Sequence, residues 1–430
     1  MRIKLSDHFT LKRLLKFVFP SIIMMIIISI YGVIDGFFVS NYLGKSAFSS
    51  LNLVMPFIMI LGGMGFMIGT GGSALVSKTL GQKENEKANK IFSMMIVFTT
   101  ILGLILSIIG IIFIRPVSYL LGSSDEMIDN CVLYGRIVTS FTALFMLQNV
   151  FQSFLATAEK PKIGLIVTIA AGTTNAVLDY LFVAVFNFGL AGAAVATGIG
   201  QVVGGLIPLI YFIFPNDSLL KLVKTKLSIK ELLAACANGS SELMSNVSSS
   251  IVGMVYNLQL MKYIGEDGVA TYGVLMYVQF VFVAIFIGYS IGTAPIVGYN
   301  YGAANYDELK NVRKKSIAIM FTSGITLSII AQLLAGTLAK IFVGYDQNLY
   351  VLTVHAFRIF SFAFILTGFN IFSSSFFTAL NNGAISALIA FLRTFVFQLG
   401  SVIMLPLIIS VDGIWLAICV AEVFATAISL

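Results

Sequence analysis

The sequence predicts an all-α integral membrane protein with twelve transmembrane helices in two six-helix bundles related by an internal repeat. Of the 430 residues, 58% are hydrophobic and only 10% are charged. A soluble globular chain normally carries about 25% charged residues. This chain has far more apolar surface than a soluble protein can bury in its core. Apolar runs of about 20 residues, the length of a membrane-spanning helix, recur along the chain, and the alternating pattern of an outer-membrane barrel is not seen.

Twelve apolar segments divide the chain. They run approximately over residues 14–40, 48–77, 91–114, 131–156, 163–186, 190–214, 231–262, 269–299, 312–342, 350–378, 384–409 and 412–430. If the N-terminus is inside, 19 of the 26 Lys and Arg residues fall on the cytoplasmic side and 5 on the outer side. The positive-inside rule therefore predicts a multi-pass protein of the cell inner (plasma) membrane with both termini in the cytoplasm. The last segment reaches Leu430 without a polar flank, which leaves open whether the chain is trimmed there.

The two halves of the chain align without a gap at an offset of 221 residues. The matches include Asn149, Phe151, Ser153 and Thr157 with Asn370, Phe372, Ser374 and Thr378. Six spans per half give both halves the same orientation, so an axis along the membrane normal should relate them. We expect an N-terminal lobe over 1–214 that carries a cation site, a basic cytoplasmic linker over 215–230, and a C-terminal lobe over 231–430. Such a pair of lobes suits alternating access.

Asp35 and Asp179 lie deep inside long apolar segments. An ionisable group at membrane depth costs roughly 2.5–3.5 kcal/mol on insertion scales, so it persists where it pairs, hydrates or does chemistry. Asn175 precedes Asp179 by four residues and shares its helix face, and Thr197 in the next span is within reach. The offset aligns Asp35 with Tyr256, Asp179 with Gly400, Asn175 with Val396 and Thr197 with Ile418. The polar set thus belongs to the N-terminal half alone.

Two carboxylates, an amide and a hydroxyl offer oxygen ligands for a hard cation such as Na⁺. Alternatively, burial and like-charge proximity make the same carboxylates proton carriers. A third interpretation is that Asp179 and Asn175 only tie helices together by hydrogen bonds, which average about 0.6 kcal/mol in membranes. For Thr197 the alternative is a hydroxyl that bonds only to the backbone of its own helix. Pro20 lies fifteen residues before Asp35 and removes a backbone hydrogen bond. A bend there that responds to protonation of Asp35 would link ion binding to cavity shape; a kink that serves packing is the alternative.

The C-terminal half holds a different set of charged residues. Glu242, at the entrance to the seventh span, is either a cavity carboxylate that attracts cations or an acid that stabilises a helix N-terminus. Arg358 and Arg393, the arginines inside spans, are candidates to line a substrate cavity with His355. The alternatives are that Arg358 snorkels or pairs with a carbonyl group and that His355 is a satisfied histidine at the outer end. Glu422, opposite Gln201 in the repeat, is a further candidate.

Other classes of protein lack support in the sequence. No GxxxxGK[ST] motif for nucleotide hydrolysis occurs, two histidines without a Cys/His cluster give no catalytic zinc site, and no nucleophile–base motif stands out. We therefore expect no enzyme activity, no cofactor apart from H⁺ or Na⁺ as coupling ion, and no nucleic acid partner. The expected partners are small organic, lipophilic cationic substrates and membrane lipid, and a monomer suffices.

At these residues the chain resembles the multidrug and toxic compound extrusion (MATE) transporters, in their DinF-like/MepA-like bacterial branch, over essentially its full length. The resemblance rests on the twelve-span repeat, Pro20 with Asp35, and Asn175-x-x-x-Asp179. It also rests on the paired segments FQSFLATAEKPK and FSSSFFTALNNG, and VSKTLGQKE and VGYNYGAANYDE. Asn175, Asp179 and Thr197 match the spacing of the cation site in DinF-like and archaeal-type members, where the first-helix aspartate joins them.

The resemblance implies an antiporter that exchanges extracellular H⁺ or Na⁺ for cytoplasmic organic, often cationic, compounds through two lobes arranged as a V. The chain departs from the other main branches, which carry a glutamate in the middle of helix seven. Here that region reads SNVSSS (245–250), and Glu242 lies about two turns earlier. The alternative function is a lipid-linked oligosaccharide flippase of related fold, which would want a cationic cavity for pyrophosphate.

Overall fold

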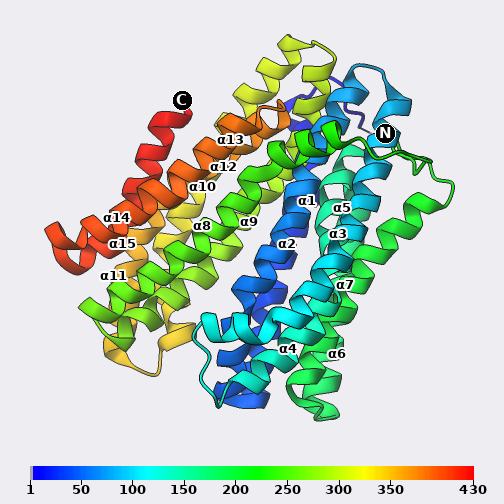
Figure 1. Ribbon diagram of the computed structural model, residues 1–430. Helices are drawn as coiled ribbons and strands as arrows, with labels where there is room; N and C mark the ends of the chain where they lie inside the picture. Colours follow the sequence, from blue (N-terminus) through cyan, green and yellow to red (C-terminus); the bar gives the residue numbers. More distant parts are fainter. Residues whose placement is uncertain (1–2) are drawn as a thin grey trace.

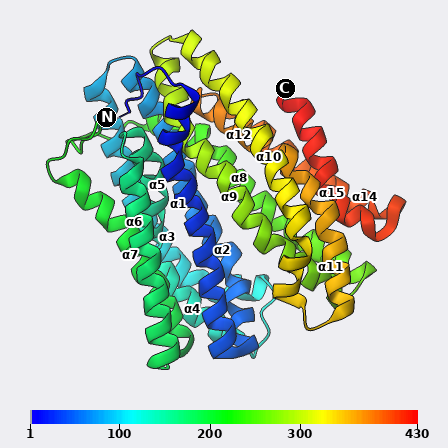
Figure 2. The same cartoon turned by 180° about the vertical axis from the view of Figure 1, so that it is seen from behind.

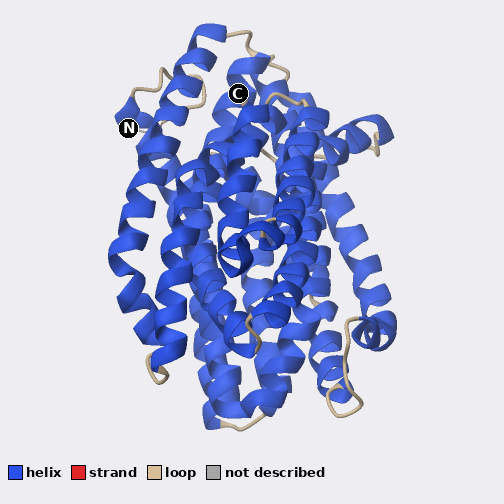
Figure 3. Ribbon diagram, turned by 90° about the vertical axis from the view of Figure 1, so that its left-hand side faces the viewer, coloured by secondary structure: helices blue, strands red, loops and turns tan. Residues whose placement is uncertain are grey.

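The computed structural model describes residues 3–430, which form helices and connecting loops without a strand (Figures 1 and 3). The α-helices are α1 (Leu11–Phe38), α2 (Gly44–Gly81), α3 (Asn85–Leu120), α4 (Ile128–Ser140), α5 (Thr142–Thr157), α6 (Pro161–Asp179), α7 (Gly189–Ile213), α8 (Ile229–Tyr263), α9 (Glu266–Gly302), α10 (Tyr306–Val343), α11 (Gln347–Phe360), α12 (Phe364–Ala379), α13 (Gly383–Phe391), α14 (Leu399–Met404) and α15 (Pro406–Ser429). Three π-helical segments, Val39–Leu43, Tyr180–Val185 and Leu392–Gln398, and a 3₁₀ turn, Ser361–Ala363, join some of them.

The predicted spans correspond to these helices. Among the described residues, ten helical stretches are long and apolar enough to cross a membrane, and α4 with α5, bent by 55°, adds an eleventh. α8 is 35 residues long but too polar to count on hydropathy, because it carries the run NGSSELMSNVSSS. The break between the last two predicted spans falls at Ile409 and Ser410, where the backbone leaves the helical region inside α15.

The internal repeat is present in the structure, since helix boundaries recur at the offset found in the sequence. α2 ends at Gly81 and α9 at Gly302, whereas α3 begins at Asn85 and α10 at Tyr306. The fourth span of each half is interrupted at equivalent places, between α4 and α5 and between α11 and α12. The two six-helix bundles therefore have the same internal architecture.

The two halves stand side by side, with the blue-to-green half (α1–α7) and the green-to-red half (α8–α15) separating toward one end of the molecule (Figures 1 and 2). The other end holds the N-terminus, the α2–α3, α5–α6 and α9–α10 turns, and the segment 214–228 that joins the halves. We call this the basic end, and the opposite one the far end. α1 and α2 of the first half contact α8 and α9 of the second.

Glycines bring the halves together near the basic end. A Cβ atom on Gly81 would overlap the Tyr299 carbonyl oxygen, and one on Gly302 would overlap the Lys78 carbonyl oxygen. These two contacts are equivalent under the repeat, so the pseudo-two-fold axis passes between α2 and α9 here. Only glycine allows backbones to approach this closely between membrane helices.

Toward the far end the halves do not touch in this way. Cβ atoms built on Gly32 of α1, Gly253 of α8 and Gly273 of α9 meet no atom within 4 Å. The Ser29 hydroxyl donates a 3.3 Å hydrogen bond to the Phe280 carbonyl oxygen and so joins α1 to α9. Ser29 lies one turn before Gly32, on the side of the basic end. The glycine contacts thus hold the halves together at the basic end, whereas the helices of the two halves diverge toward the far end (Figures 1 and 2).

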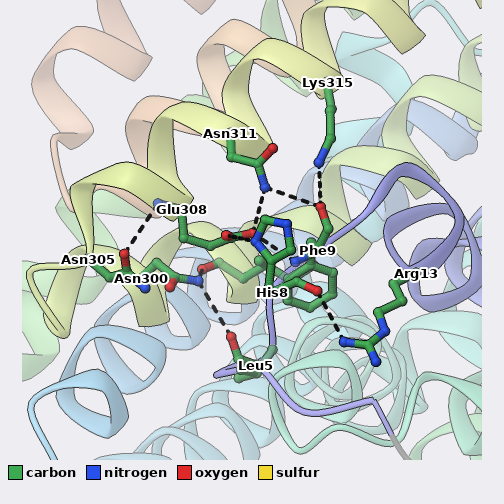
Figure 4. Close-up of polar contacts among 10 residues, drawn as sticks. Leu5, His8, Phe9, Arg13, Asn300, Asn305, Glu308, Asn311 and Lys315 are labelled. Carbon is green, nitrogen blue, oxygen red and sulfur yellow. Dashed lines mark hydrogen bonds and ion pairs between the residues drawn. The ribbon is translucent and has the colours of Figure 1, made fainter.

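An N-terminal strap, residues 3–10, crosses the basic end before α1 begins (Figure 2). The Leu5 N–H donates to Glu159 Oε1 in the first half, at 2.8 Å, and the Phe9 N–H donates to Glu308 Oε1 in the second, at 2.9 Å. His8 Nδ1 lies 2.6 Å from Glu308 Oε2, and Lys315 Nζ donates to the Phe9 carbonyl oxygen (Figure 4). Leu5 and Phe9 are fully buried, so the strap is part of the packed structure.

Candidate functional site

Asp35 and Asp179 each lie at a transition from α-helix to π-helix. Asp35 is in the last turn of α1, before the π-helical segment Val39–Leu43, and Asp179 ends α6, before the segment Tyr180–Val185. The two π-helical segments contact each other. Such segments are uncommon and occur often at functional sites, because the widened turn re-aims nearby side chains.

The structure brings the four predicted N-terminal residues to one place. A cavity of about 170 Å³ is lined by Asp35, Asn175 and Thr197. Asp179 is fully buried and lies close enough to Asp35 and Asn175 to interact with both. Asn175 and Asp179 share a face of α6 as their spacing requires, and α7 supplies Thr197, whose hydroxyl donates to the Ala193 carbonyl oxygen in its own helix at 3.1 Å.

Several polar atoms of this cluster are buried without a hydrogen bond to any described residue. They are Asp35 Oδ1, both carboxylate oxygens of Asp179, Asn175 Nδ2, Gln201 Oε1 and the Tyr134 hydroxyl. A buried ion without a partner costs several kcal/mol, so unpaired carboxylates at this depth take up a cation or a proton. The donor set is oxygen-rich and fits a hard cation such as Na⁺. Residues 3–430 hold no group of three or more His, Cys, Asp or Glu side chains arranged for a metal.

Sequence reasoning did not single out other polar residues of the cavity wall. Tyr31 of α1, Tyr134 of α4, Gln148 of α5 and Gln201 of α7 also line the cavity. The Tyr134 hydroxyl lies near Thr197 and the two carboxylates. The repeat offset could have identified two of them. Tyr134 aligns with His355 and Gln148 with Phe369, so these positions also differ between the halves.

Pro20 lies away from this cluster. α1 continues through Pro20 as one helix, and fifteen residues of helix place Pro20 about 22 Å from Asp35 along the axis. The neighbouring backbone at Ser21 and Ile22 is in close contact with Gly288 of α9. Pro20 therefore lies where α1 meets the second half. A bend of α1 coupled to Asp35 stays a prediction.

In the C-terminal half, Arg393, whose side chain is 22% exposed, forms an ion pair with the buried Glu422. Its guanidinium donates to both oxygens of Glu422, with Nη2 2.6 Å from Oε1, and Glu422 is only 3% exposed. Asn370 Nδ2 donates to Glu422 Oε2 at 2.6 Å, and the Thr426 hydroxyl donates to Asn370 Oδ1 at 3.2 Å. Every contact in this network ties α12, α15 and the π-helical segment Leu392–Gln398 together.

The other C-terminal candidates are separate from one another. His355 Nε2 lies 2.8 Å from Asp412 Oδ1, and both side chains are more than half exposed. Arg358 is exposed, and its backbone carbonyl accepts a hydrogen bond from Gln332. Glu242 is partly exposed on α8, where its backbone carbonyl accepts from Asn246 Nδ2. Neither Glu242, Arg358 nor Arg393 lines the N-terminal cavity.

The MatE family profile matches residues 20–181 and 243–403, one stretch in each half. The chain belongs to the MatE family. The first stretch begins at Pro20 and ends two residues after Asp179, so three of the four clustered residues lie inside it. That the profile matches once in each half agrees with the internal repeat.

This MatE member has curated relatives and structural neighbours. It is 28% identical over 328 residues to the multidrug export protein MepA of Staphylococcus haemolyticus, covering 74% of this chain and 71% of the relative. A crystal structure of MATE in complex with MaL6 superposes with a TM-score of 0.93 at 22% identity, covering 98% of this chain and 95% of the neighbour. A structure described as the outward-facing conformation of a multidrug resistance MATE family transporter gives 0.92 at 22% identity, with 98% and 95% coverage. At this identity the neighbours show the fold.

Proposed function

We propose that the chain is a secondary active multidrug efflux transporter that exchanges extracellular H⁺ or Na⁺ for cytoplasmic organic, often cationic, compounds by alternating access. The observation that carries this proposal is the cluster of buried, unpaired carboxylates at Asp35 and Asp179, found in one of two otherwise equivalent halves. Membership of the MatE family and likeness to multidrug export proteins named MepA support it. The helices of the two halves diverge toward the far end, and we assign the exit of the compound to that side.

The cavity beside Asp35 is assigned to the coupling ion. Its volume of about 170 Å³ is below the roughly 300 Å³ at which pockets begin to enclose a drug-sized ligand. Asp35, Asp179, Asn175 and Thr197 supply the oxygen atoms for Na⁺, or the two carboxylates carry the proton. We place the organic compound between the two halves, which diverge toward the far end.

Ion and compound must favour different states of the transporter, because a ligand that binds both states equally shifts nothing. Entry of the cation from outside offsets one of the two carboxylate charges, removes their mutual repulsion and stabilises the form that releases the compound. Loss of the cation to the cytoplasm leaves two like charges buried side by side, which disfavours that form. The aromatic and thioether wall of the cavity, with Tyr31, Met55, Met59 and Phe145, adapts its shape at low cost during this change.

The moving units in this proposal are the N-terminal lobe over 1–214, with the cation site, and the C-terminal lobe over 231–430. The segment 215–230 links them. The lobes rock about the glycine contacts of α2 with α9, near Gly81 and Gly302. The basic end faces the cytoplasm by the positive-inside rule, so the form described here faces outward. We infer a plasma-membrane monomer with H⁺ or Na⁺ in place of a cofactor and no enzyme activity.

The charges of the structure disfavour the flippase. Arg393 is already engaged by Glu422, and Arg358 is exposed. The N-terminal cavity contains an acidic group and no basic one. A pyrophosphate-bearing lipid would therefore find no cluster of cationic donors in that cavity.

The test is efflux of a fluorescent lipophilic cation from proteoliposomes under an imposed proton gradient or an imposed sodium gradient. Wild-type protein should export the cation under one of the gradients, and Asp179→Asn should lose at least about 90% of the rate, because the coupling site is gone. Asp125→Asn, in the α3–α4 turn, is the matched control and should behave as wild type. Equal gradient-driven rates for Asp179→Asn and wild type would show that the ion site is misplaced.

A further inference from the structure

Two adjoining cavities lie near the basic end of the N-terminal half, between α3, α7 and the segment 214–228. The first, of about 490 Å³, is an apolar groove whose wall includes Ile96, Val97 and Ile101 of α3 with Leu209 and Ile213 of α7. The second, of about 470 Å³, is a lysine cavity lined by Lys87, Lys90, Lys224 and Lys226. Lys224 lines both cavities, so the groove and the lysine cavity lie next to each other.

The segment between the halves is fixed on α3 by hydrogen bonds. The Lys221 N–H donates to Asn89 Oδ1 and the Val223 N–H donates to Ser93 Oγ, both at 2.9 Å. The Thr225 hydroxyl donates to the Lys90 carbonyl oxygen, also at 2.9 Å. The backbone that carries Lys224 and Lys226 is therefore anchored, and the lysines are held around one cavity.

The lysine cavity carries an excess of positive charge. Lys90, Lys224 and Lys226 are exposed and form no salt bridge with any residue in 3–430. Lys87 pairs with Glu84 at 3.1 Å, and Glu231 is the acidic residue in the cavity wall. Three lysines without a salt bridge, against one acidic residue in the wall, leave a net positive charge that attracts a polyvalent anion such as a phosphate group.

The groove has the opposite character. The side chains of Val97, Ile101 and Ile213 are 52%, 53% and 60% exposed. On a membrane-spanning helix, apolar side chains that are this exposed face lipid. From Lys90 to Ile101 the helix rises about 16 Å, close to half of the roughly 30 Å hydrocarbon core of a bilayer. Lysines at the membrane surface above an apolar groove match a phosphate headgroup above an acyl chain.

We propose that this groove binds an anionic phospholipid, with its phosphate on Lys90, Lys224 and Lys226 and an acyl chain along Val97 and Ile101. Basic pockets between transmembrane helices on the cytoplasmic side are suited to anionic headgroups. The lipid would lie on the segment that links the two halves along the chain and strengthen its attachment to α3. The proposal does not depend on which ion or compound is transported.

Binding is measured by native mass spectrometry of the detergent-solubilised full chain, with phosphatidylglycerol and phosphatidylcholine of the same acyl chains. Wild-type protein should retain phosphatidylglycerol more than about tenfold better than phosphatidylcholine, since lysines at the membrane surface attract an anionic headgroup. The triple variant Lys90→Gln/Lys224→Gln/Lys226→Gln should lose that preference. Lys12→Gln/Lys310→Gln/Lys314→Gln, which removes three other exposed lysines, should keep it. Equal binding of both lipids to wild type, or an unchanged preference in the first triple variant, would overturn the proposal.

A second pair of variants tests the groove. Val97→Trp places a large ring in it, and Ile108→Trp places the same ring on a lipid-facing position of α3 that is 60% exposed and does not line it. Phosphatidylglycerol retention should fall at least about fivefold in Val97→Trp and stay unchanged in Ile108→Trp. Retention that is unaffected by Val97→Trp and is abolished by millimolar inorganic phosphate would identify a simple anion site and overturn the lipid assignment. Monodisperse elution of all four variants in size-exclusion chromatography establishes that each is folded.

Discussion

Glu308, in the first turn of α10, accepts a 2.9 Å hydrogen bond from the backbone N–H of Phe9 and so fixes the N-terminal strap to the C-terminal half. Glu159 makes the corresponding bond to Leu5 from the N-terminal half. The strap is thus attached to both halves at the end where they are closed. Opening of the basic end must break one of the two attachments.

Glu308→Ala should shift the transporter away from the form closed at the basic end. The substitution removes the acceptor of the Phe9 N–H, the partner of His8 and the acceptor of Asn311, and a hydrogen bond to a charged group contributes about 1.5–3 kcal/mol. We expect at least about a tenfold change in the open-to-closed ratio. It is measured from the distance between spin labels at residues 87 and 310, after replacement of the three native cysteines.

Glu266→Ala is the control for this experiment, because Glu266 lies in the first turn of α9, at the far end from the strap. Its distance distribution should match that of the unsubstituted protein. Identical distributions for Glu308→Ala and Glu266→Ala would mean that the strap does not hold the basic end closed.

Gly81→Ala should also shift the transporter away from the form closed at the basic end, in this case through a steric overlap. The added methyl group would overlap the Tyr299 carbonyl oxygen, so α2 and α9 must separate. Gly273→Ala introduces the same methyl group on α9 where no atom lies within 4 Å, and alanine is about 1 kcal/mol better than glycine in a helix. We expect Gly81→Ala to lengthen the distance between the labels and slow export more than tenfold. Normal export by Gly81→Ala would show that the contact is not needed in the transport cycle.

The sequence was sufficient for the architecture because a membrane imposes strong rules on length, hydrophobicity and charge. The repeat offset also located Asp35, Asp179, Asn175 and Thr197, which the structure places together. It was not sufficient for contacts between halves, such as Glu308 with Phe9, because a carboxylate near a helix N-terminus has many available partners. It also did not show that Arg393 and Glu422 are paired, since they are 29 residues apart on different helices.

Asp35→Asn should abolish gradient-driven export and leave the protein as stable as wild type or more so. Replacing a buried carboxylate by a neutral amide removes a desolvation cost of several kcal/mol. Asp35 Oδ1 has no hydrogen-bond partner among the described residues, so the substitution breaks no hydrogen bond at that atom. We therefore expect a melting temperature in detergent at or above the wild-type value. Loss of export together with a strongly lowered melting temperature would instead indicate a structural role for Asp35 in tying helices together.

Arg393→Met should destabilise the protein, because it leaves Glu422 buried without its cationic partner. Removing one partner of a buried pair costs about 3–5 kcal/mol, whereas replacing both by apolar residues is often neutral or stabilising. The double variant Arg393→Met/Glu422→Leu should thus recover at least half of the lost melting temperature.

If Arg393 acts only through this ion pair, the double variant also regains export of the lipophilic cation. Recovery of stability without recovery of export would instead assign Arg393 or Glu422 a part in binding the transported compound, as their place in the C-terminal half had suggested. Thermal unfolding and proteoliposome efflux on the same three proteins separate the two roles.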